Sequence, residues 1–355
     1  MFISVVRRFG RWAVLPVAAL LALLAWGWFA LLDANPLAGA ASALVVIPTL
    51  VAGTVLTLGV LAVPSGWKPQ NTLSPQEAPA LWALWDEVDP PKGRRRILAV
   101  DSGLNASMAD IRGPLGLRRH EVLTLGLPLL MMLDEPAIRA VVSHEAGHAR
   151  LDHAAGTTNI IEFIGVFDFL FFYAAPYDTI VGALAHAALE GGLRRTERAR
   201  RDLSRQNEFE ADAFSADKSA SARALVLVGA AGRVLARRIF QPVEREVLGA
   251  MSPPMSPIRR MEAQLNSLLG ETTSQALVEP EPELDDESAA DLARYGATHP
   301  PLEERLAKLG YSSPPDVAPV SRPASSDLLS PEMLAALIAT FDRSWRTAFE
   351  RMIDR

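Results

Sequence analysis

The chain has 355 residues, 49% of them hydrophobic, and this is too apolar for an ordinary soluble protein unless the apolar residues are concentrated in one region. Lys and Arg total 35 against 41 Asp and Glu, and a net charge of −6 leaves no basic excess that would indicate a nucleic-acid partner. The chain contains no cysteine, which excludes a disulfide scaffold, a thiol nucleophile and a thiolate metal site.

Two apolar runs near the N-terminus predict a membrane anchor. Residues 12–32 contain no charge, and 21 helical residues match a bilayer core of about 30 Å. A second charge-free run at 37–63 follows after a short connection and is long enough to cross again. We therefore predict a transmembrane hairpin within residues 1–68. A signal peptide is the alternative, because basic residues precede the first run and small residues follow at 38–43, but the apolar part is too long for one.

The charges around these runs predict an orientation. Basic residues flank both outer ends, at Arg7, Arg8, Arg11, Lys68, Lys92, Arg94, Arg95 and Arg96. The connection between the runs carries only Asp33. By the positive-inside rule both ends are cytoplasmic, so we expect a multi-pass protein of the cell (inner) membrane whose remaining chain faces the cytoplasm.

The next part of the chain predicts helices with a few short strands. Residues 72–88 have apolar side chains at helical spacing after Ser74-Pro75, which is a typical helix start. Residues 97–100 and 121–125 are rich in strand-forming residues. Residues 134–154 predict a long helix. These elements indicate a mainly α domain with a small β-sheet, which is an α+β fold, over residues 72–310.

Residues 160–190 are apolar but interrupted by acidic residues and a proline. They predict a helical hairpin lying in the membrane interface, with insertion across the bilayer as the alternative. A charged helix at 194–220 and an apolar helix at 221–238 are expected to follow. Residues 271–291 form an acidic, proline-containing stretch that is typical of a solvated loop.

The C-terminal part begins with a Pro- and Ser-rich stretch at 311–330, which predicts a linker. Residues 331–355 predict an amphipathic helix that starts at a Ser-Pro-Glu cap. Its apolar face consists of Leu334, Leu337, Ile338, Phe341, Trp345, Phe349 and Met352. We expect this face to dock on the body, with binding to a partner or to the membrane as the alternative.

The decisive motif is His144-Glu145-Ala146-Gly147-His148, an H-E-x-x-H sequence in the helix predicted at 134–154. Residues four apart project from the same side of a helix, so the two imidazoles can reach one ion. Glu145 is then placed to take a proton from water at the open coordination position. The motif predicts one Zn²⁺ per chain.

A catalytic zinc needs a third protein ligand, and the absence of cysteine restricts it to His or carboxylate. Glu208 and Asp212 are also spaced four apart, so one can bind the ion while the other orients a ligand imidazole. Spacing alone does not distinguish this segment from other acidic helices.

Together these residues resemble the HtpX and CaaX-prenyl-protease type of zinc metallopeptidases, whose motifs are H-E-x-x-H and E-x-x-x-D. The resemblance covers about residues 72–310 and implies a zincin-like, mostly helical gluzincin domain. It implies roles for individual positions: His144, His148 and Glu208 as zinc ligands, Asp212 as the residue behind them, Glu145 as catalytic base, His299 and Arg305 near the oxyanion and substrate, and Asn105 beside the strand that aligns the substrate. Of the remaining histidines, His153 is expected to be a surface residue near the end of its helix, and His120 and His186 are expected to be structural.

The predicted function is a membrane-anchored zinc endopeptidase that hydrolyses protein or peptide substrates at the lipid bilayer, in membrane-protein quality control or processing. The prenyl-protein proteases need more clean spans than this chain has, which favours the HtpX-like role. One alternative is an intramembrane protease, which Arg139, Arg150 and Asp152 on the motif helix disfavour. Another is a catalytically inactive binding or scaffold protein. No pattern indicates an oligomeric state.

Overall fold

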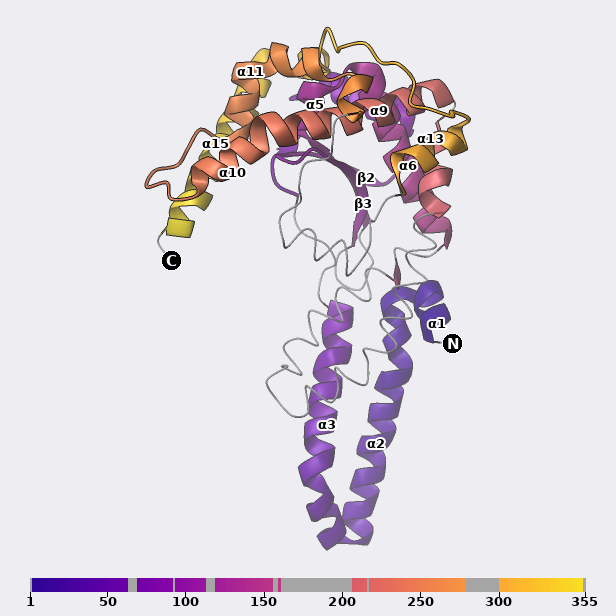
Figure 1. Ribbon diagram of the computed structural model, residues 1–355. Helices are drawn as coiled ribbons and strands as arrows, with labels where there is room; N and C mark the ends of the chain where they lie inside the picture. The colour runs from indigo at the N-terminus through magenta and orange to yellow at the C-terminus, as the bar shows by residue number, and fades with distance from the viewer. Residues whose placement is uncertain are drawn as a thin grey trace. The chain divides into compact units, whose positions relative to one another are not determined.

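The computed structural model describes residues 2–62, 69–91, 93–112, 119–155, 159–160, 206–215, 217–278 and 300–353 (Figure 1). The chain divides into two compact units. The anchor unit comprises Met1–Lys68, Asp110–His120 and Leu151–Arg200, and the core unit comprises Pro69–Ala109, Glu121–Arg150 and Arg201–Arg355. The structure is mostly helical with one four-stranded sheet, which confirms the predicted fold class.

The anchor unit is built around the predicted hairpin. Helix α2 (Leu15–Ala34) and helix α3 (Pro36–Ala62) run side by side, after α1 (Phe2–Phe9) and the short η1 (Gly10–Val14) (Figure 1). The two helices approach closely at glycines, because a Cβ atom on Gly53 would lie 2.7 Å from the side chain of Leu21. The indole nitrogen of Trp28 donates a hydrogen bond to the carbonyl of Gly39 at 3.0 Å.

Among the described residues, three helical stretches are long and apolar enough to cross a membrane by length and composition: Ser4–Ala34, Pro36–Ala62 and Lys218–Val247. The first two have 6% and 11% of their most apolar window buried, so their apolar side chains face outward. The third is 50% buried, and its buried residues belong to the hydrophobic core of the core unit. The first two are therefore the better candidates for membrane spans.

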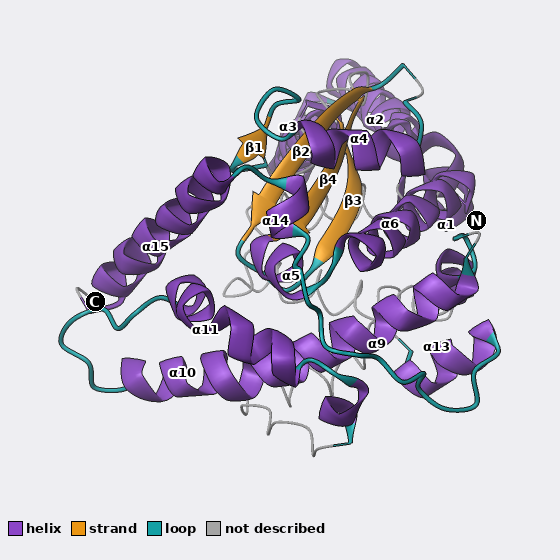
Figure 2. Ribbon diagram, turned by 90° about the horizontal axis from the view of Figure 1, so that it is seen from above, coloured by secondary structure: helices purple, strands orange, loops and turns teal. Residues whose placement is uncertain are grey.

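The sheet has the strand order β1-β2-β4-β3 (Figure 2). Its strands are β1 (Thr72–Leu73), β2 (Arg95–Asp101), β3 (Ala106–Arg112) and β4 (Arg119–Gly126). β1 pairs antiparallel with β2, with Thr72 opposite Ala99, and β3 lies at the other edge. The strands predicted at 97–100 and 121–125 correspond to β2 and β4. The other two were not predicted, because β1 has only two residues and β3 contains only one β-branched residue, Ile111.

Helix α4 (Pro79–Val88) begins later than predicted. Residues 75–77 form a turn in which the Glu77 carboxylate accepts hydrogen bonds from the backbone and hydroxyl of Ser74. Ala78 is outside the helical region (φ −139°, ψ 62°), since a residue before proline is disfavoured in the α conformation. The helix therefore starts at Pro79, with Leu81, Leu84 and Trp85 buried.

Helices α5 (Leu127–Met132) and α6 (Glu135–Ala155) follow the sheet. Every residue of α5 is buried, and the sequence did not predict this short helix because an all-apolar run has no helical period. Residues 206–212 are helical, but the helix predicted at 194–220 does not continue through 213–215. A new helix starts because the side chain of Asp217 caps it by accepting from the backbone nitrogens of Ser219 and Ala220.

This new helix, α9 (Lys218–Leu235), contributes buried residues to the hydrophobic core and continues as the π-helical turn η3 (Ala236–Phe240) and α10 (Gln241–Val247). Helix α11 (Pro257–Glu271) and the short η4 (Ser274–Leu277) come next. Residues 161–190 of the expected apolar hairpin and residues 279–291 of the expected acidic loop lie outside the described residues.

The last part of the chain comprises α13 (Leu302–Leu309), α14 (Ser325–Leu328) and α15 (Pro331–Ile353). Residues 311–330, predicted as a linker, instead pack on the core, where Val317, Val320 and Ala324 are buried and the backbone nitrogen of Ala324 donates to Leu133 at 2.7 Å. Composition suggested a linker, but these few apolar side chains fix the segment. α15 packs on α11 through its apolar face.

Candidate metal centre

The H-E-x-x-H motif lies on α6, as its spacing predicted. The carboxylate of Asp134 accepts a hydrogen bond from the backbone nitrogen of Ala137 and so caps the start of the helix. Ile138, Val142 and Ala146 are fully buried at helical spacing and fix one side of α6 in the core. This packing leaves the side chains of His144 and His148 half-buried, at 15% and 20% exposure, toward the helix at 206–212.

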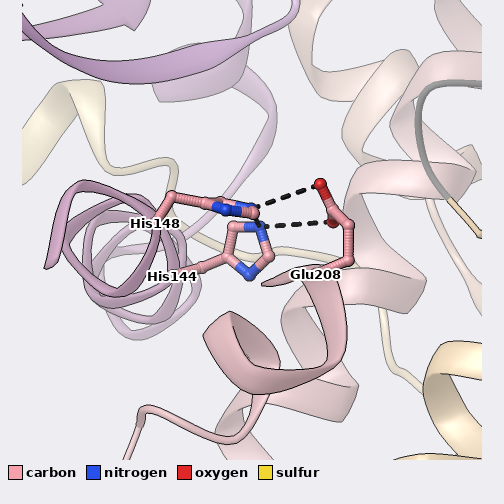
Figure 3. Close-up of side chains that lie close together, drawn as sticks. All are labelled: His144, His148 and Glu208. Atoms are coloured by element: carbon pink, nitrogen blue, oxygen red, sulfur yellow. Dashed lines mark hydrogen bonds and ion pairs between the residues drawn. The ribbon is translucent and has the colours of Figure 1, made fainter. Parts of the chain in front are cut away.

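His144, His148 and Glu208 bring three ligand atoms within 4.8 Å of one another (Figure 3). The two Nε2 atoms are 3.0 Å apart. His148 Nε2 lies 3.2 Å from Glu208 Oε1, and His144 Nε2 lies 3.7 Å from Glu208 Oε2. Figure 3 shows both imidazoles reaching from one helix toward the carboxylate of another.

These separations fit a small divalent cation. Ligands held about 2.1 Å from zinc in a tetrahedral arrangement lie roughly 3.4 Å from one another. The observed 3.0, 3.2 and 3.7 Å bracket that value. Glu208 is 2% exposed, and a buried carboxylate against two imidazoles is favourable when a cation compensates its charge. The donor set of two imidazoles and one carboxylate is the type that zinc peptidases use.

Asp212 lies behind this cluster. Its Oδ1 atom is 2.9 Å from His144 Nδ1, so a proton on Nδ1 leaves Nε2 free to bind a cation. Arg305 donates to both oxygens of Asp212, at 2.8 Å from Nε and 2.6 Å from Nη2. Burial tends to raise the pKa of Asp212, but these partners outweigh it and hold the pKa below its usual value. Asp212 is therefore an anion that fixes the His144 ring.

A cavity of about 240 Å³ opens beside the cluster. Its polar lining residues are His144, Glu145, Asp212 and Arg305, together with Asn105 just before β3 and Ser221 on α9. Glu145 thus borders both the candidate metal ligands and a space that a substrate can enter. The other described lining residues are apolar.

A buried ion network supports α6 just beyond the motif. Arg150 donates to the carboxylate of Asp89, which also accepts from Arg96. Arg96 donates to Glu121 at 2.9 Å as well, and its guanidinium lies 4.6 Å from the ring centre of Trp85. The network fixes α6 relative to the sheet and α4. No sequence pattern predicts this network, because its members are scattered along the chain.

The structure brings together seven of the eight residues singled out in the sequence. His144, His148 and Glu208 form the cluster, Asp212 and Arg305 lie behind it, and Glu145 and Asn105 line the adjoining cavity. His299 lies outside the described residues. Sequence reasoning missed the cavity wall on α9, formed by Ser221, Ala224, Leu225 and Val228. Their i, i+3, i+4, i+7 spacing in the apolar helix predicted at 221–238 was a usable signal for one side of a helix.

A helix that carries H-E-x-x-H, joined by a buried glutamate from a second helix, is the arrangement of a metallopeptidase. Peptidase family M48 matches residues 115–313, more than half of the chain, and the chain belongs to this family. The family includes the type that the motifs resembled.

Among solved structures, the crystal structure of S. mikatae Ste24p is similar, with 16% sequence identity and a TM-score of 0.34. The match covers 84% of this chain and 64% of that chain, so the chain spans less than two thirds of the length of that structure. No curated protein sequence matches this chain. By sequence the chain belongs to a peptidase family, and its described part includes helices long and apolar enough to cross a membrane.

Proposed function

We propose that the chain is a membrane-anchored, zinc-dependent endopeptidase that hydrolyses peptide bonds in protein or peptide substrates. The observation that carries the proposal is the convergence of His144, His148 and Glu208 beside Glu145 at the mouth of a cavity. Membership of Peptidase family M48 supports it independently.

The residues divide the chemistry among them. Zinc held by His144, His148 and Glu208 would activate water and polarise the scissile carbonyl. Glu145 would take a proton from the attacking water and return it to the leaving amine. Asp212 would hold the ring of His144 in place through Nδ1.

Two further groups would serve the substrate. β3 lies at an edge of the sheet, and Asn105 immediately precedes it and lines the cavity, so an extended substrate can lie alongside this strand. His299, together with Arg305, would stabilise the oxyanion. Arg305 borders the cavity, but its guanidinium is bonded to Asp212, which gives it a positioning role as well.

The proposed location rests on the anchor. Helices α2 and α3 would form the hairpin in the cell (inner) membrane, and the basic residues at both outer ends favour a peptidase domain on the cytoplasmic side. A peptidase tethered there meets membrane proteins and their cytoplasmic segments. We propose that its role is membrane-protein quality control or processing.

The test compares the detergent-purified full chain with its Glu145→Gln variant. We expect the wild type to contain one zinc per chain and to hydrolyse casein, whereas Glu145→Gln retains zinc and loses hydrolysis. The variant keeps the size of the side chain and removes its basicity. Equal activity of the two proteins would contradict the assignment. A wild type that binds zinc but cleaves neither casein nor peptides would favour the inactive scaffold.

A further inference from the structure

The cavity beside Glu145 has a mostly apolar wall, and hydrolysis of a peptide bond does not itself require apolar side chains there. Apart from its polar residues, among them Ser221 on α9, it is lined by Leu104, Ala106, Leu129, Ala140, Val141, Ala224, Leu225 and Val228. Among the described residues of this wall, no side chain is charged. Such a surface favours apolar groups and rejects charged ones, because a buried charge without a partner is costly.

The wall is built from elements that are fixed in the core. Ser221, Ala224, Leu225 and Val228 occupy one side of α9, while Val226, Leu227 and Ala230 on its other side are fully buried. Ala140 and Val141 lie one turn before His144 and Glu145 on α6. The same helix therefore presents the ionisable groups and part of the apolar wall, so the distance between them does not vary.

The volume of the cavity limits what it can hold. An apolar cavity of about 150 Å³ accepts a benzene-sized group, and pockets for drug-sized ligands begin at about 300 Å³. At about 240 Å³ this cavity holds one bulky side chain, such as Leu, Met or Phe, and not a longer lipid chain. Two alanines, Ala140 and Ala224, leave the space open.

We propose that this cavity is a specificity pocket that binds one uncharged, bulky apolar side chain next to the scissile bond, with Ala224 and Val228 setting its size. The inference rests on the proposed peptidase function and names the substrate class for it. The enzyme then prefers to cut beside Leu, Met or Phe and discriminates against Ala and against charged residues at that position.

The experiment uses the full chain in detergent with a set of peptides that differ at one position flanking the scissile bond. We expect kcat/KM for Leu to exceed that for Ala by about tenfold and that for Asp by at least about 100-fold. Ala224→Leu fills the cavity and should lower the Leu-to-Ala ratio about tenfold. Val228→Ala enlarges it and should raise the Trp-to-Leu ratio by a similar factor.

Val226→Ala is the matched control. It makes the same change on the same helix two residues earlier, at a fully buried position outside the cavity wall. We expect it to lower the melting temperature but to leave both ratios within about twofold of the wild type. Equal kcat/KM for Leu and Asp, or ratios that respond equally to Val226→Ala and Val228→Ala, would overturn the specificity pocket.

Peptide binding separates this inference from the proposed function. Fluorescently labelled peptides are titrated into Glu145→Gln protein that carries each cavity change. If the wild type cleaves no peptide, the proposed function fails. The pocket is still supported if the Leu peptide binds more tightly than the Asp peptide and if Ala224→Leu abolishes this difference. Equal binding of the two peptides overturns it.

Discussion

Arg305 donates two hydrogen bonds to Asp212, which is 93 residues away in the chain, and the two side chains are 13% and 3% exposed. Asp212 in turn lies 2.9 Å from the Nδ1 atom of His144. A guanidinium and a carboxylate thus fix a candidate zinc ligand from behind. Arg305 also lies 3.6 Å from Glu208, so it influences two of the three ligand residues.

Loss of Arg305 should weaken zinc binding. We expect Arg305→Ala to lower zinc affinity about 10- to 100-fold, as changes to residues behind metal ligands do. Arg305→Lys should recover only part of it, because an ammonium cannot donate the bidentate pair. Zinc affinity is measured by competition with a chelator. Arg259→Ala, which removes an exposed arginine paired with Glu262, is the control and should leave affinity unchanged; equal effects of Arg259→Ala and Arg305→Ala would contradict this role.

Asp212→Asn should affect both stability and the metal. The variant takes from the buried charge of Arg305 its bidentate partner and leaves it the more distant Glu208 at 3.6 Å, which costs on the order of 3 kcal/mol. It should also weaken zinc binding, because the amide holds His144 less firmly. Adding Arg305→Met removes the stranded charge, so the double variant should unfold at higher temperature than Asp212→Asn while its zinc affinity stays low. If the double variant regained zinc affinity together with stability, the weaker zinc binding of Asp212→Asn would be a consequence of its lower stability and not of a loosely held His144.

The sequence was informative where spacing along one helix determines the geometry. His144, Glu145 and His148 are close in the chain, so helical periodicity was enough to place them on one side of α6. The choice of Glu208 as third ligand needed the family motif, because an isolated E-x-x-x-D also fits a solvated helix. In the structure Glu208 and Asp212 are both buried beside α6, a placement that spacing alone does not reveal.

Contacts between elements that are distant in the chain could not be predicted from the sequence. The pairing of Arg305 with Asp212 and the network of Arg96, Asp89 and Arg150 join residues from separate elements, and no periodicity reports on them. The prediction of a linker at 311–330 was wrong for a related reason. Its proline and serine content is typical of a linker, whereas a few apolar residues such as Val317 and Ala324 determine that it packs.

Gly147, inside the H-E-x-x-H motif, lies where α6 closely approaches Ala211 and Phe214. A Cβ atom there would lie 3.0 Å from Phe214 Cβ and 3.1 Å from Ala211 Cα, which is tighter than ordinary packing. Ala211 lies between Glu208 and Asp212, so Gly147→Ala should displace the third ligand and lower zinc affinity. Helix propensity alone predicts the opposite effect on stability, because alanine favours a helix over glycine by about 1 kcal/mol. A loss of zinc affinity would therefore come from the close contact and not from the helix itself.

Gly270→Ala provides the control for this substitution. Gly270 lies in α11, and a Cβ atom there meets nothing within 4 Å. The change should therefore raise the melting temperature slightly and leave zinc affinity unchanged. Retained zinc affinity in Gly147→Ala, measured by chelator competition, would show that the two helices can separate without disturbing the ligands.

Asp134 makes the start of α6 sensitive to acid. Its carboxylate accepts from both terminal nitrogens of Arg223, at 2.9 and 2.5 Å, and from the backbone nitrogen of Ala137. Burial tends to raise the pKa of Asp134, but Arg223 and the backbone hydrogen bond outweigh it and lower the pKa. An acid whose pKa is lower in the folded state stabilises the fold above its unfolded value of about 3.9 and loses this effect as the pH falls through the folded value.

Asp134→Asn tests this pH dependence, because asparagine still caps a helix but cannot form the ion pair. We expect the variant to be less stable than the wild type by about 1 kcal/mol at neutral pH, since the pair is partly exposed. The difference in melting temperature should stay constant above about pH 5 and shrink below about pH 4. Both proteins are measured with chelator present, so that acid release of metal does not contribute. A difference that persists undiminished at pH 3 would show that the charge of Asp134 is not what stabilises α6.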